Sequence, residues 1–282
     1  MNGFIYGVPN GVPYRVYSRS CTNNVYPHRV YPGVFYHSYN GSWYRMPTPE
    51  LAGGPESEQE RPPHAEQTDW ASLYPSEVLL HGPQVKEVSL TFDDGPDTEW
   101  TPQVLSILKQ YGVKATFFCV GHRIQTNPDV FMQMIQDGHE VGNHSWSHPN
   151  LSKLPAEEIR RQLTLTNEQV QRLIGVKPAN LRPPYGAINE DVIDIARSLD
   201  LKIILWNVDS VDWNRLTGEQ VAANVLANTG PGSIILMHSA TGEGGTLQGT
   251  VDGLPRIIEK LQQLGYSFKT VSQLLDIPAY VR

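Results

Sequence analysis

The sequence predicts an α/β fold in which parallel strands are surrounded by helices, and two observations lead to this prediction. From about Lys86 onward, short apolar segments alternate with longer segments whose apolar residues recur at helical spacing. Glycines close several of the longer segments, as they often do at helix C-termini. A succession of six or seven strand–helix units is typical of a barrel, either closed or incomplete.

Each element can be assigned in order. The expected strands are KEVSLTF (86–92), VKATFFCVG (113–121), HEVGNHS (139–145), ANLRPPYG (179–186), KIILWNVDS (202–210) and GSIILMHS (232–239). The expected helices are TPQVLSILKQYG (101–112), NPDVFMQMIQDG (127–138), PAEEIRRQLTLTNEQVQRLIG (155–175), NEDVIDIARSLD (189–200), TGEQVAANVLANT (217–229) and LPRIIEKLQQLG (254–265). In the first helix, Thr101 and Pro102 are expected as the N-cap and the first helical residue.

The chain before this alternation has a different composition. Residues 1–49 contain eight of the 13 tyrosines, four arginines and no acidic residue, which indicates a Tyr/Gly/Pro-rich tail that is largely irregular and disordered. A surface-adhesion segment is the less favoured interpretation. Residues 50–84 are expected to form an acidic, proline-rich linker, and the folded domain is expected at 85–276.

Charge and cysteine content exclude some classes of function. The formal net charge of −7 does not favour a nucleic-acid or anionic-membrane partner, because such partners require basic patches. Cys21 and Cys119 lie in different contexts, so a disulfide framework is not expected, and Cys119 reads as a buried apolar residue. Neither a secretory signal nor a transmembrane segment is visible in the sequence.

Polar side chains follow the predicted strands at the points where those strands end. Because the carboxyl ends of parallel strands converge on one face of a barrel, we expect these residues to meet. They are Asp93 and Asp94, His144, Arg182, Asp209 with Asp212, and His238. Each alone has an ordinary explanation, such as a helix cap or a surface ion pair, but such a set on successive strand ends is hard to obtain by chance.

The segment HSWSH suggests a metal site. On a helical turn, the spacing of His144 and His148 would place both imidazoles on one face, as a metal-binding pair requires. A carboxylate from the first strand end would complete a two-histidine, one-carboxylate site, which is of the catalytic type because coordination positions stay open. His139 is a competing ligand, but it precedes its strand and is expected at the opposite end of the barrel.

Five segments occur in a characteristic order along the chain. They are TFDDGP (91–96), HSWSH (144–148), RPPYG (182–186), DSVDW (209–213) and ILMH (235–238). In this order they resemble the polysaccharide deacetylase family, also called the NodB-homology domain or carbohydrate esterase family 4. The wording of GNHSWSHP, LRPPYGAI and VDSVDW is most similar to bacterial peptidoglycan N-acetylglucosamine deacetylases. The resemblance implies a deformed (β/α) barrel.

The resemblance also implies a role for each matching residue. The metal ligands would be Asp94, His144 and His148. The catalytic residues would be Asp93 as general base, Arg182 as its orienting partner, His238 as general acid and Asp212 as the residue that tunes it. The substrate-binding residues would be Tyr185, through a backbone N–H near the oxyanion, and Trp213 and Leu236 as walls of an acetyl pocket. Ser239 departs from the family, which often has an acidic residue there.

The two neighbouring aspartates are expected to divide the work. Successive residues of a strand point to opposite sides, so Asp93 and Asp94 can reach different partners where the strand gives way to Gly95-Pro96. One would hold the metal, and the other would take a proton from the attacking water.

The implied activity is the metal-dependent removal of N-acetyl groups from an N-acetylglucosamine-containing polysaccharide, such as peptidoglycan or chitin, with release of acetate. Zinc is the expected metal, with cobalt or another divalent ion as an alternative. An O-acetyl xylan esterase with the same machinery and a non-catalytic glycan-binding or coat protein are the competing hypotheses. The expected partner is the acetylated glycan, the expected state is a monomer, and the substrate class suggests the cell wall or spore, although no export signal is visible.

Overall fold

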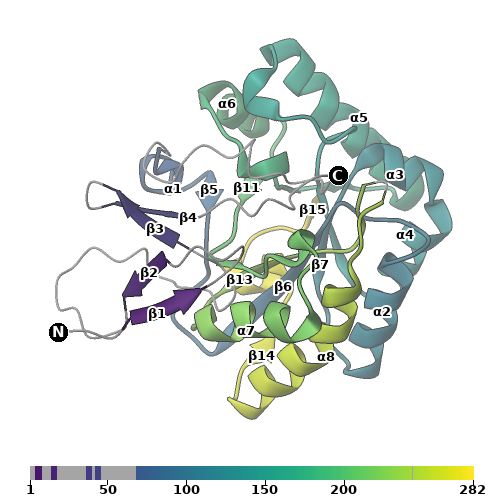
Figure 1. Cartoon of the computed structure of the whole chain (residues 1–282). Coiled ribbons are helices and arrows are strands. Elements are labelled where there is room, and N and C mark those ends of the chain that lie inside the picture. The colour runs from purple at the N-terminus through teal and green to yellow at the C-terminus, as the bar shows by residue number, and fades with distance from the viewer. Residues whose placement is uncertain (1–3, 8–13, 18–35, 40–41, 46–67, 243) are drawn as a thin grey trace.

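The computed structural model describes residues 4–7, 14–17, 36–39, 42–45, 68–242 and 244–282. Its centre is a curled sheet of parallel strands with helices packed on its outside (Figure 1). In sheet order, its strands are β12 (Val208–Asp209), β13 (Ile234–His238), β6 (Glu87–Asp93), β7 (Thr116–Cys119), β8 (Glu140–Asn143), β10 (Asn180–Leu181), β11 (Lys202–Ile204) and β5 (Val78–Leu79). The incomplete barrel predicted from the βα alternation is therefore confirmed.

Shorter strands complete the described topology. β14 (Ser267–Phe268) pairs with the start of β6 in parallel, and β15 (Tyr280–Val281) pairs with β9 (Lys177–Pro178) in antiparallel orientation. Near the N-terminus, β1 (Phe4–Gly7) pairs with β2 (Tyr14–Tyr17), and β3 (Tyr36–Tyr39) pairs with β4 (Ser42–Arg45).

The helices connect successive strands. They are α1 (Trp70–Leu73), α2 (Thr101–Gln110), α3 (Gly121–Thr126), α4 (Pro128–Gln136), α5 (Ala156–Ile174), α6 (Glu190–Ser198), α7 (Gly218–Asn228), α8 (Gln248–Gln263) and α9 (Val271–Leu275). All six predicted helices are present, and α8 begins earlier than predicted. The sequence pattern did not reveal α3 or α9, because helices this short complete barely one turn of the apolar period.

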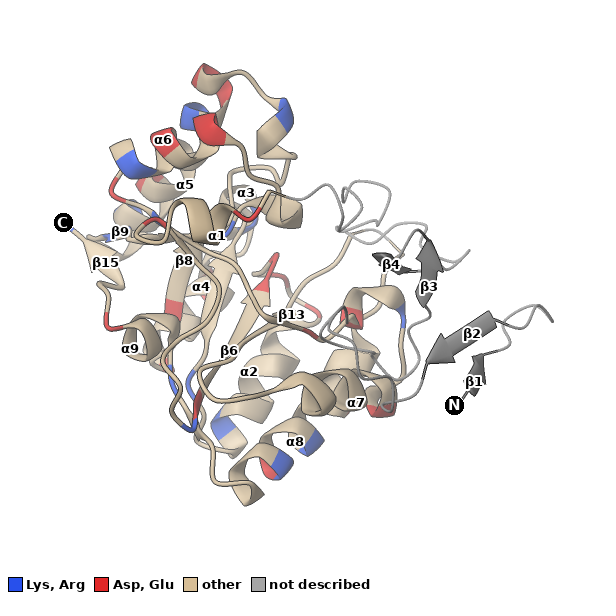
Figure 2. Ribbon diagram, turned by 90° about the vertical axis from the view of Figure 1, so that its left-hand side faces the viewer, with Lys and Arg blue, Asp and Glu red and all other residues tan. Residues whose placement is uncertain are grey.

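The apolar core lies between the sheet and its helices. The strands β6, β7 and β13 are buried along their length, as expected for parallel strands covered by helices. Apolar side chains of α2, α4, α7 and α8 pack on them in one large cluster. Lys, Arg, Asp and Glu are frequent on the outer helices α5, α6 and α8 (Figure 2). Cys119 lies in the core and is buried, as predicted, and this burial raises the pKa of its thiol.

The N-terminal boundary of the fold differs from the sequence prediction. Residues 50–84 were expected to be a linker, but α1 and β5 lie within this range, and β5 pairs with β11 in the main sheet. The acidic composition of the stretch masks a two-residue strand, which leaves almost no periodic signal. Four short strands are described within the tail predicted as irregular, and residues 46–67 and Cys21 lie outside the described residues.

The N-terminus of α2 corrects one local prediction. Thr101 was expected as the N-cap, but it is the first residue of α2 and Trp100 is the N-cap; Oδ1 of Asp97, just before the helix, accepts hydrogen bonds from the backbone N–H groups of Glu99, Trp100 and Thr101. The Thr101 hydroxyl instead donates to the carbonyl of Ser239, 2.8 Å away. The last aspartate of DDGPD therefore anchors the helix that follows the first strand, beside the strand end of β13.

In the described residues there is no helix with both the length and the apolar character needed to cross a membrane.

Candidate active site

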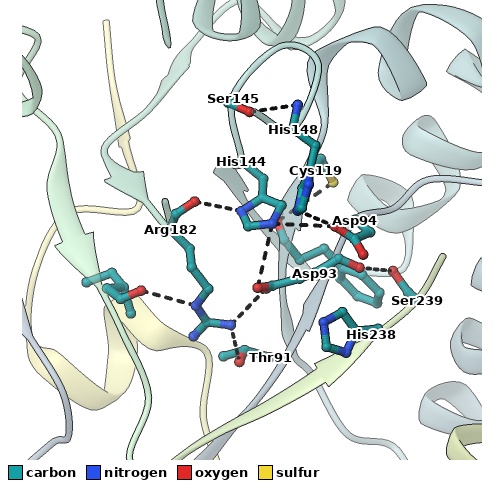
Figure 3. Close-up of polar contacts among 12 residues, drawn as sticks. Thr91, Asp93, Asp94, Cys119, His144, Ser145, His148, Arg182, His238 and Ser239 are labelled. Carbon is teal, nitrogen blue, oxygen red and sulfur yellow. Dashed lines mark hydrogen bonds and ion pairs between the residues drawn. The ribbon is translucent and has the colours of Figure 1, made fainter. Parts of the chain in front are cut away.

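The polar residues at the strand ends meet at the C-terminal end of the parallel strands, as predicted (Figure 3). Asp93 is the last residue of β6 and His238 the last residue of β13, and the two are register partners on adjacent parallel strands. His144 directly follows β8, and Arg182 directly follows β10. All four side chains are buried.

Asp94, His144 and His148 form a group that could hold a metal ion. One potential ligand atom from each residue lies within 4.8 Å of the others. Nε2 of His148 is 3.2 Å and Nε2 of His144 is 3.5 Å from Oδ1 of Asp94. Among the described residues, this is the one group of histidine, cysteine or carboxylate side chains that lie close enough together to hold a metal ion.

The group has the unsatisfied polar atoms that a metal site requires. Neither carboxylate oxygen of Asp94 accepts a hydrogen bond, and Nε2 of both imidazoles makes none, although all are buried. Buried polar atoms are rarely left in this state unless a ligand satisfies them. Two imidazole nitrogens and one carboxylate are also the donor set of catalytic zinc sites with an open position.

Hydrogen bonding and charge prepare the ligands for a cation. The Nδ1 atom of His144 lies 2.6 Å from the carbonyl oxygen of Arg182, so Nδ1–H donates there and Nε2 keeps its lone pair for a metal. Burial raises the pKa of Asp94, but the charge of His148 and the close approach of both imidazoles to the carboxylate outweigh burial and hold this pKa well below its usual value. Asp94 is therefore ionised, as a metal ligand would need to be.

The backbone that carries these ligands departs from the predicted conformation. On a helical turn the spacing of the two histidines would place them on one face, but HSWSH is a loop in which Ser145 and His148 have positive φ angles of 64° and 61°. Asp94 also has a positive φ, of 73°. Such angles cost energy in residues other than glycine, and here they turn the three ligands toward one point.

Arg182 is the buried partner of Asp93. Its Nη1 donates to Oδ1 of Asp93 at 2.8 Å and to the Thr91 hydroxyl at 2.7 Å. Its Nε and Nη2 donate to the carbonyls of Ile204 and Leu205, both at 3.1 Å. These contacts fix the guanidinium from several directions, so the orientation of the Asp93 carboxylate is fixed as well.

Two aromatic rings support the same guanidinium. Its central carbon lies 4.3 Å from the ring centroid of Phe118 and 5.5 Å from that of Trp206. Cation–π contacts of this kind are stronger when they are shielded from water. Sequence reasoning missed both rings because they lie in apolar strand segments, where an aromatic residue signals only the core.

His238 and Asp212 form a second buried pair. Nδ1 of His238 lies 2.7 Å from Oδ1 of Asp212, and Oδ2 of Asp212 accepts from the His238 backbone N–H at 2.9 Å. The hydroxyl of Thr250, at the start of α8, donates to the same Oδ2 at 2.7 Å. Thr250 was not identified from the sequence, since it follows a glycine-rich loop and belongs to no motif.

Other predicted residues lie around this centre. Tyr185 has a positive φ of 61°, and its ring packs edge-on against His148 at a centroid distance of 4.8 Å. Trp213 and Leu236 are buried. His139 lies near the opposite end of the sheet, where its Nδ1 accepts from the Ala115 N–H, and it stands apart from the metal group as expected.

Ser239 has a structural contact in place of the acidic residue often found in the family. Its backbone N–H donates to the carbonyl of Asp93 at 3.0 Å, and its hydroxyl lies 3.3 Å from the same oxygen. A side chain on Gly95 would meet this hydroxyl at 2.5 Å. Ser239 therefore packs closely against the turn that carries both aspartates.

Comparison with known proteins agrees with this geometry. The polysaccharide deacetylase family profile matches residues 81–204. A peptidoglycan N-acetylglucosamine deacetylase of Bacillus cereus is 43% identical over 208 residues, which make up 73% of this chain and 74% of that protein. The chain belongs to the polysaccharide deacetylase family.

Two further relatives refine the comparison. This deacetylase family member is 37% identical over 195 residues to the peptidoglycan N-acetylmuramic acid deacetylase PdaC of Bacillus subtilis, covering 69% of this chain and 40% of PdaC. It is also similar to the crystal structure of a peptidoglycan N-acetylglucosamine deacetylase, with a TM-score of 0.72 at 41% identity, covering 76% of this chain and 99% of that one. The family fold predicted from the motifs is thereby confirmed.

Proposed function

We propose that this protein is a metal-dependent hydrolase that removes N-acetyl groups from the glycan strands of peptidoglycan and releases acetate. The observation that carries the proposal is the arrangement of three groups on one face: the Asp94–His144–His148 donor set, the Asp93–Arg182 pair and the Asp212–His238 pair. The substrate class follows the names of its relatives, which act on either amino sugar of this polymer.

The donor set fits a divalent cation, and we propose zinc. Asp94, His144 and His148 would be its three protein ligands, and their unsatisfied buried atoms would be satisfied by it. When bound, such an ion polarises the amide carbonyl and makes water more acidic.

Asp93 would act as the general base. Its Oδ1 is occupied by Arg182, and its Oδ2 lies 3.8 Å from Nε2 of the ligand His144. The base is therefore held directly beside the metal group, where it can accept a proton from attacking water. Arg182 would keep the carboxylate ionised and correctly turned.

His238 would act as the general acid. Because Nδ1 is bonded to Asp212, Nε2 is the ring nitrogen that would deliver a proton to the departing amine. Asp212 is anchored through both oxygens and would stabilise the imidazolium. His238 and Asp93 are register partners on neighbouring strands, which supports their assignment as the acid and the base of one reaction.

A substrate panel tests this proposal. Acetate release is measured from N-acetylated peptidoglycan, chitin oligomers and O-acetylated xylan, with the protein loaded with zinc or stripped by a chelator. We expect release from the N-acetylated glycans that disappears with the chelator and returns with metal. Release from xylan alone would support the esterase, and no release from any glycan by the metal-loaded protein would support a non-catalytic glycan-binding protein.

A further inference from the structure

A pocket of about 200 Å³ lies beside the candidate metal ligands. Asp94 and His148 form one part of its wall. The rest consists of Ser147, which lies within the HSWSH segment, and of three residues that belong to none of the family motifs: Val120, His122 and Arg123. His122 and Arg123 lie in the first turn of α3, so an element that the sequence did not predict brings two basic side chains next to the reaction centre.

The charge of Arg123 is not balanced by a carboxylate within the described part of the chain. Its Nη1 donates to the backbone carbonyl of Asp94 at 3.1 Å, and its Nη2 donates to the carbonyl of Thr241 at 2.8 Å. Both acceptors are neutral. The nearby carboxylate of Asp94 faces the imidazoles of His144 and His148, where a metal would take up its charge.

These contacts leave the guanidinium positioned and still able to bind. A guanidinium has five N–H donors, and two of them hold the backbone on either side of the pocket. The side chain is half-buried and lines the pocket, and a cation in such a recess attracts anions more strongly than one in open solvent. Carboxylates are the anions whose geometry best matches an arginine, because two parallel hydrogen bonds can form.

The position of the pocket limits where this carboxylate belongs. Arg123 contacts the backbone of Asp94, one of the three candidate metal ligands. A carboxylate bound by Arg123 would therefore belong to the sugar whose acetamide reacts or to the adjacent sugar. In peptidoglycan, every second sugar is a muramic acid, and its lactyl ether carries a carboxyl group that is free wherever no stem peptide is attached to it. Chitin has no such group.

We propose that this pocket is a subsite for the free lactyl carboxylate of a muramic acid that carries no stem peptide, and that Arg123 is the residue that selects for it. The proposal deepens the proposed function and rests on it. It predicts that the enzyme prefers an alternating, carboxylate-bearing strand to a neutral one for electrostatic reasons, with Arg123 as the chief contributor and His122 as a weaker one.

The test compares two substrates that differ in this charge and by one methyl group on each lactyl group. One is a peptide-free tetrasaccharide of alternating N-acetylglucosamine and N-acetylmuramic acid, and the other is the same molecule with its lactyl groups converted to methyl esters. For the zinc-loaded full chain, kcat/KM is measured for both from acetate release, and mass spectrometry identifies the sugar that lost its acetyl group. We expect the free carboxylate to be preferred about tenfold, equivalent to about 1.4 kcal/mol.

Variants separate selection from a purely structural role. Arg123→Gln should bring the preference close to one, chiefly through KM, while Arg123→Lys should keep most of it because the charge remains. His122→Glu places a negative charge in the pocket without touching the two hydrogen bonds of Arg123, and it should reduce the preference relative to the neutral control His122→Gln. Metal content is measured in each variant, since Arg123 also holds the Asp94 carbonyl.

The ratio of kcat/KM for the free-carboxylate substrate to kcat/KM for its methyl ester decides the outcome. An equal preference in the wild type and Arg123→Gln would overturn the subsite, even if Arg123→Gln lowers both rates, because a structural role affects both substrates alike. No preference in the wild type would also overturn it, while the proposed deacetylase function would stand. Failure of the metal-loaded wild type to release acetate from any N-acetylated glycan would refute both.

Discussion

The buried pair of Arg182 and Asp93 offers a quantitative test of how the site is built. We consider the change Arg182→Met, which keeps an unbranched chain of similar length but removes the charge and all the donors. Four hydrogen bonds of 2.7–3.1 Å are lost, to Thr91, Asp93, Ile204 and Leu205. Removing one partner of a fully buried ion pair typically costs about 3–5 kcal/mol, because the other charge stays buried.

The local environment indicates the lower part of this range. Nε2 of His144 lies 3.8 Å from Oδ2 of Asp93 and offers partial compensation. We therefore expect Arg182→Met to lower the free energy of unfolding by about 3 kcal/mol. The double variant Arg182→Met/Asp93→Asn no longer buries a lone charge, so it should be about 2 kcal/mol more stable than the sum of the two single effects predicts.

The assay is urea unfolding of the metal-free protein at pH 7, followed by circular dichroism and tryptophan fluorescence. The matched control is Arg161→Met, because Arg161 pairs with Glu158 on the exposed face of α5, where solvent screens the charges and their loss should change stability little. Additivity of the two active-site changes within about 0.5 kcal/mol would refute the reasoning, since it would mean that the two charges do not depend on each other.

Three further predictions concern the metal, the acid and a buried histidine. Asp94→Ala should lose bound zinc and activity together. Asp93→Asn should retain zinc, measured by elemental analysis, and lose turnover at least about 100-fold, measured by acetate release. Robust turnover in Asp93→Asn would overturn the base assignment. His238→Ala should slow N-acetyl hydrolysis by about 10²–10⁴-fold but affect 4-nitrophenyl acetate much less, because a phenolate departs without a proton; equal losses would remove the general-acid role. Burial, with the nearby charge of Lys114, lowers the pKa of His139 to about 4. As the pH falls, His139 is therefore protonated in the unfolded chain before it is protonated in the folded protein. The free energy of unfolding should fall as the pH drops from about 6.5 toward 4, by about 2 kcal/mol between pH 7 and 4.5. His139→Asn should remove this share of the pH dependence in urea unfolding, and an unchanged profile would contradict it.

Much of the candidate site was predictable because its signals are local. An apolar strand that ends in Asp93 and Asp94, and a later one that ends in His238, can be recognised from a few residues each. Parallel strands then bring those ends together without further information. The spacing of His144 and His148 indicated a metal pair, although the two residues lie on a loop and not on a helical turn. Two histidines four residues apart can also meet across a loop, and positive φ angles at Ser145 and His148 make that possible.

What the sequence alone determined is the βα alternation, the polar residue at each strand end and the ordered motifs of the family. What only the tertiary structure decided are the contacts between residues far apart in the chain. Thr250 holds Asp212 across 38 positions, Phe118 and Trp206 flank Arg182, and Arg123 links Asp94 to Thr241. Local pattern cannot reveal such partners, because a hydrogen bond or a ring contact depends on where the packed core places two segments and not on their spacing in sequence. The same reason explains β5, whose two residues become a strand only when β11 lies beside them.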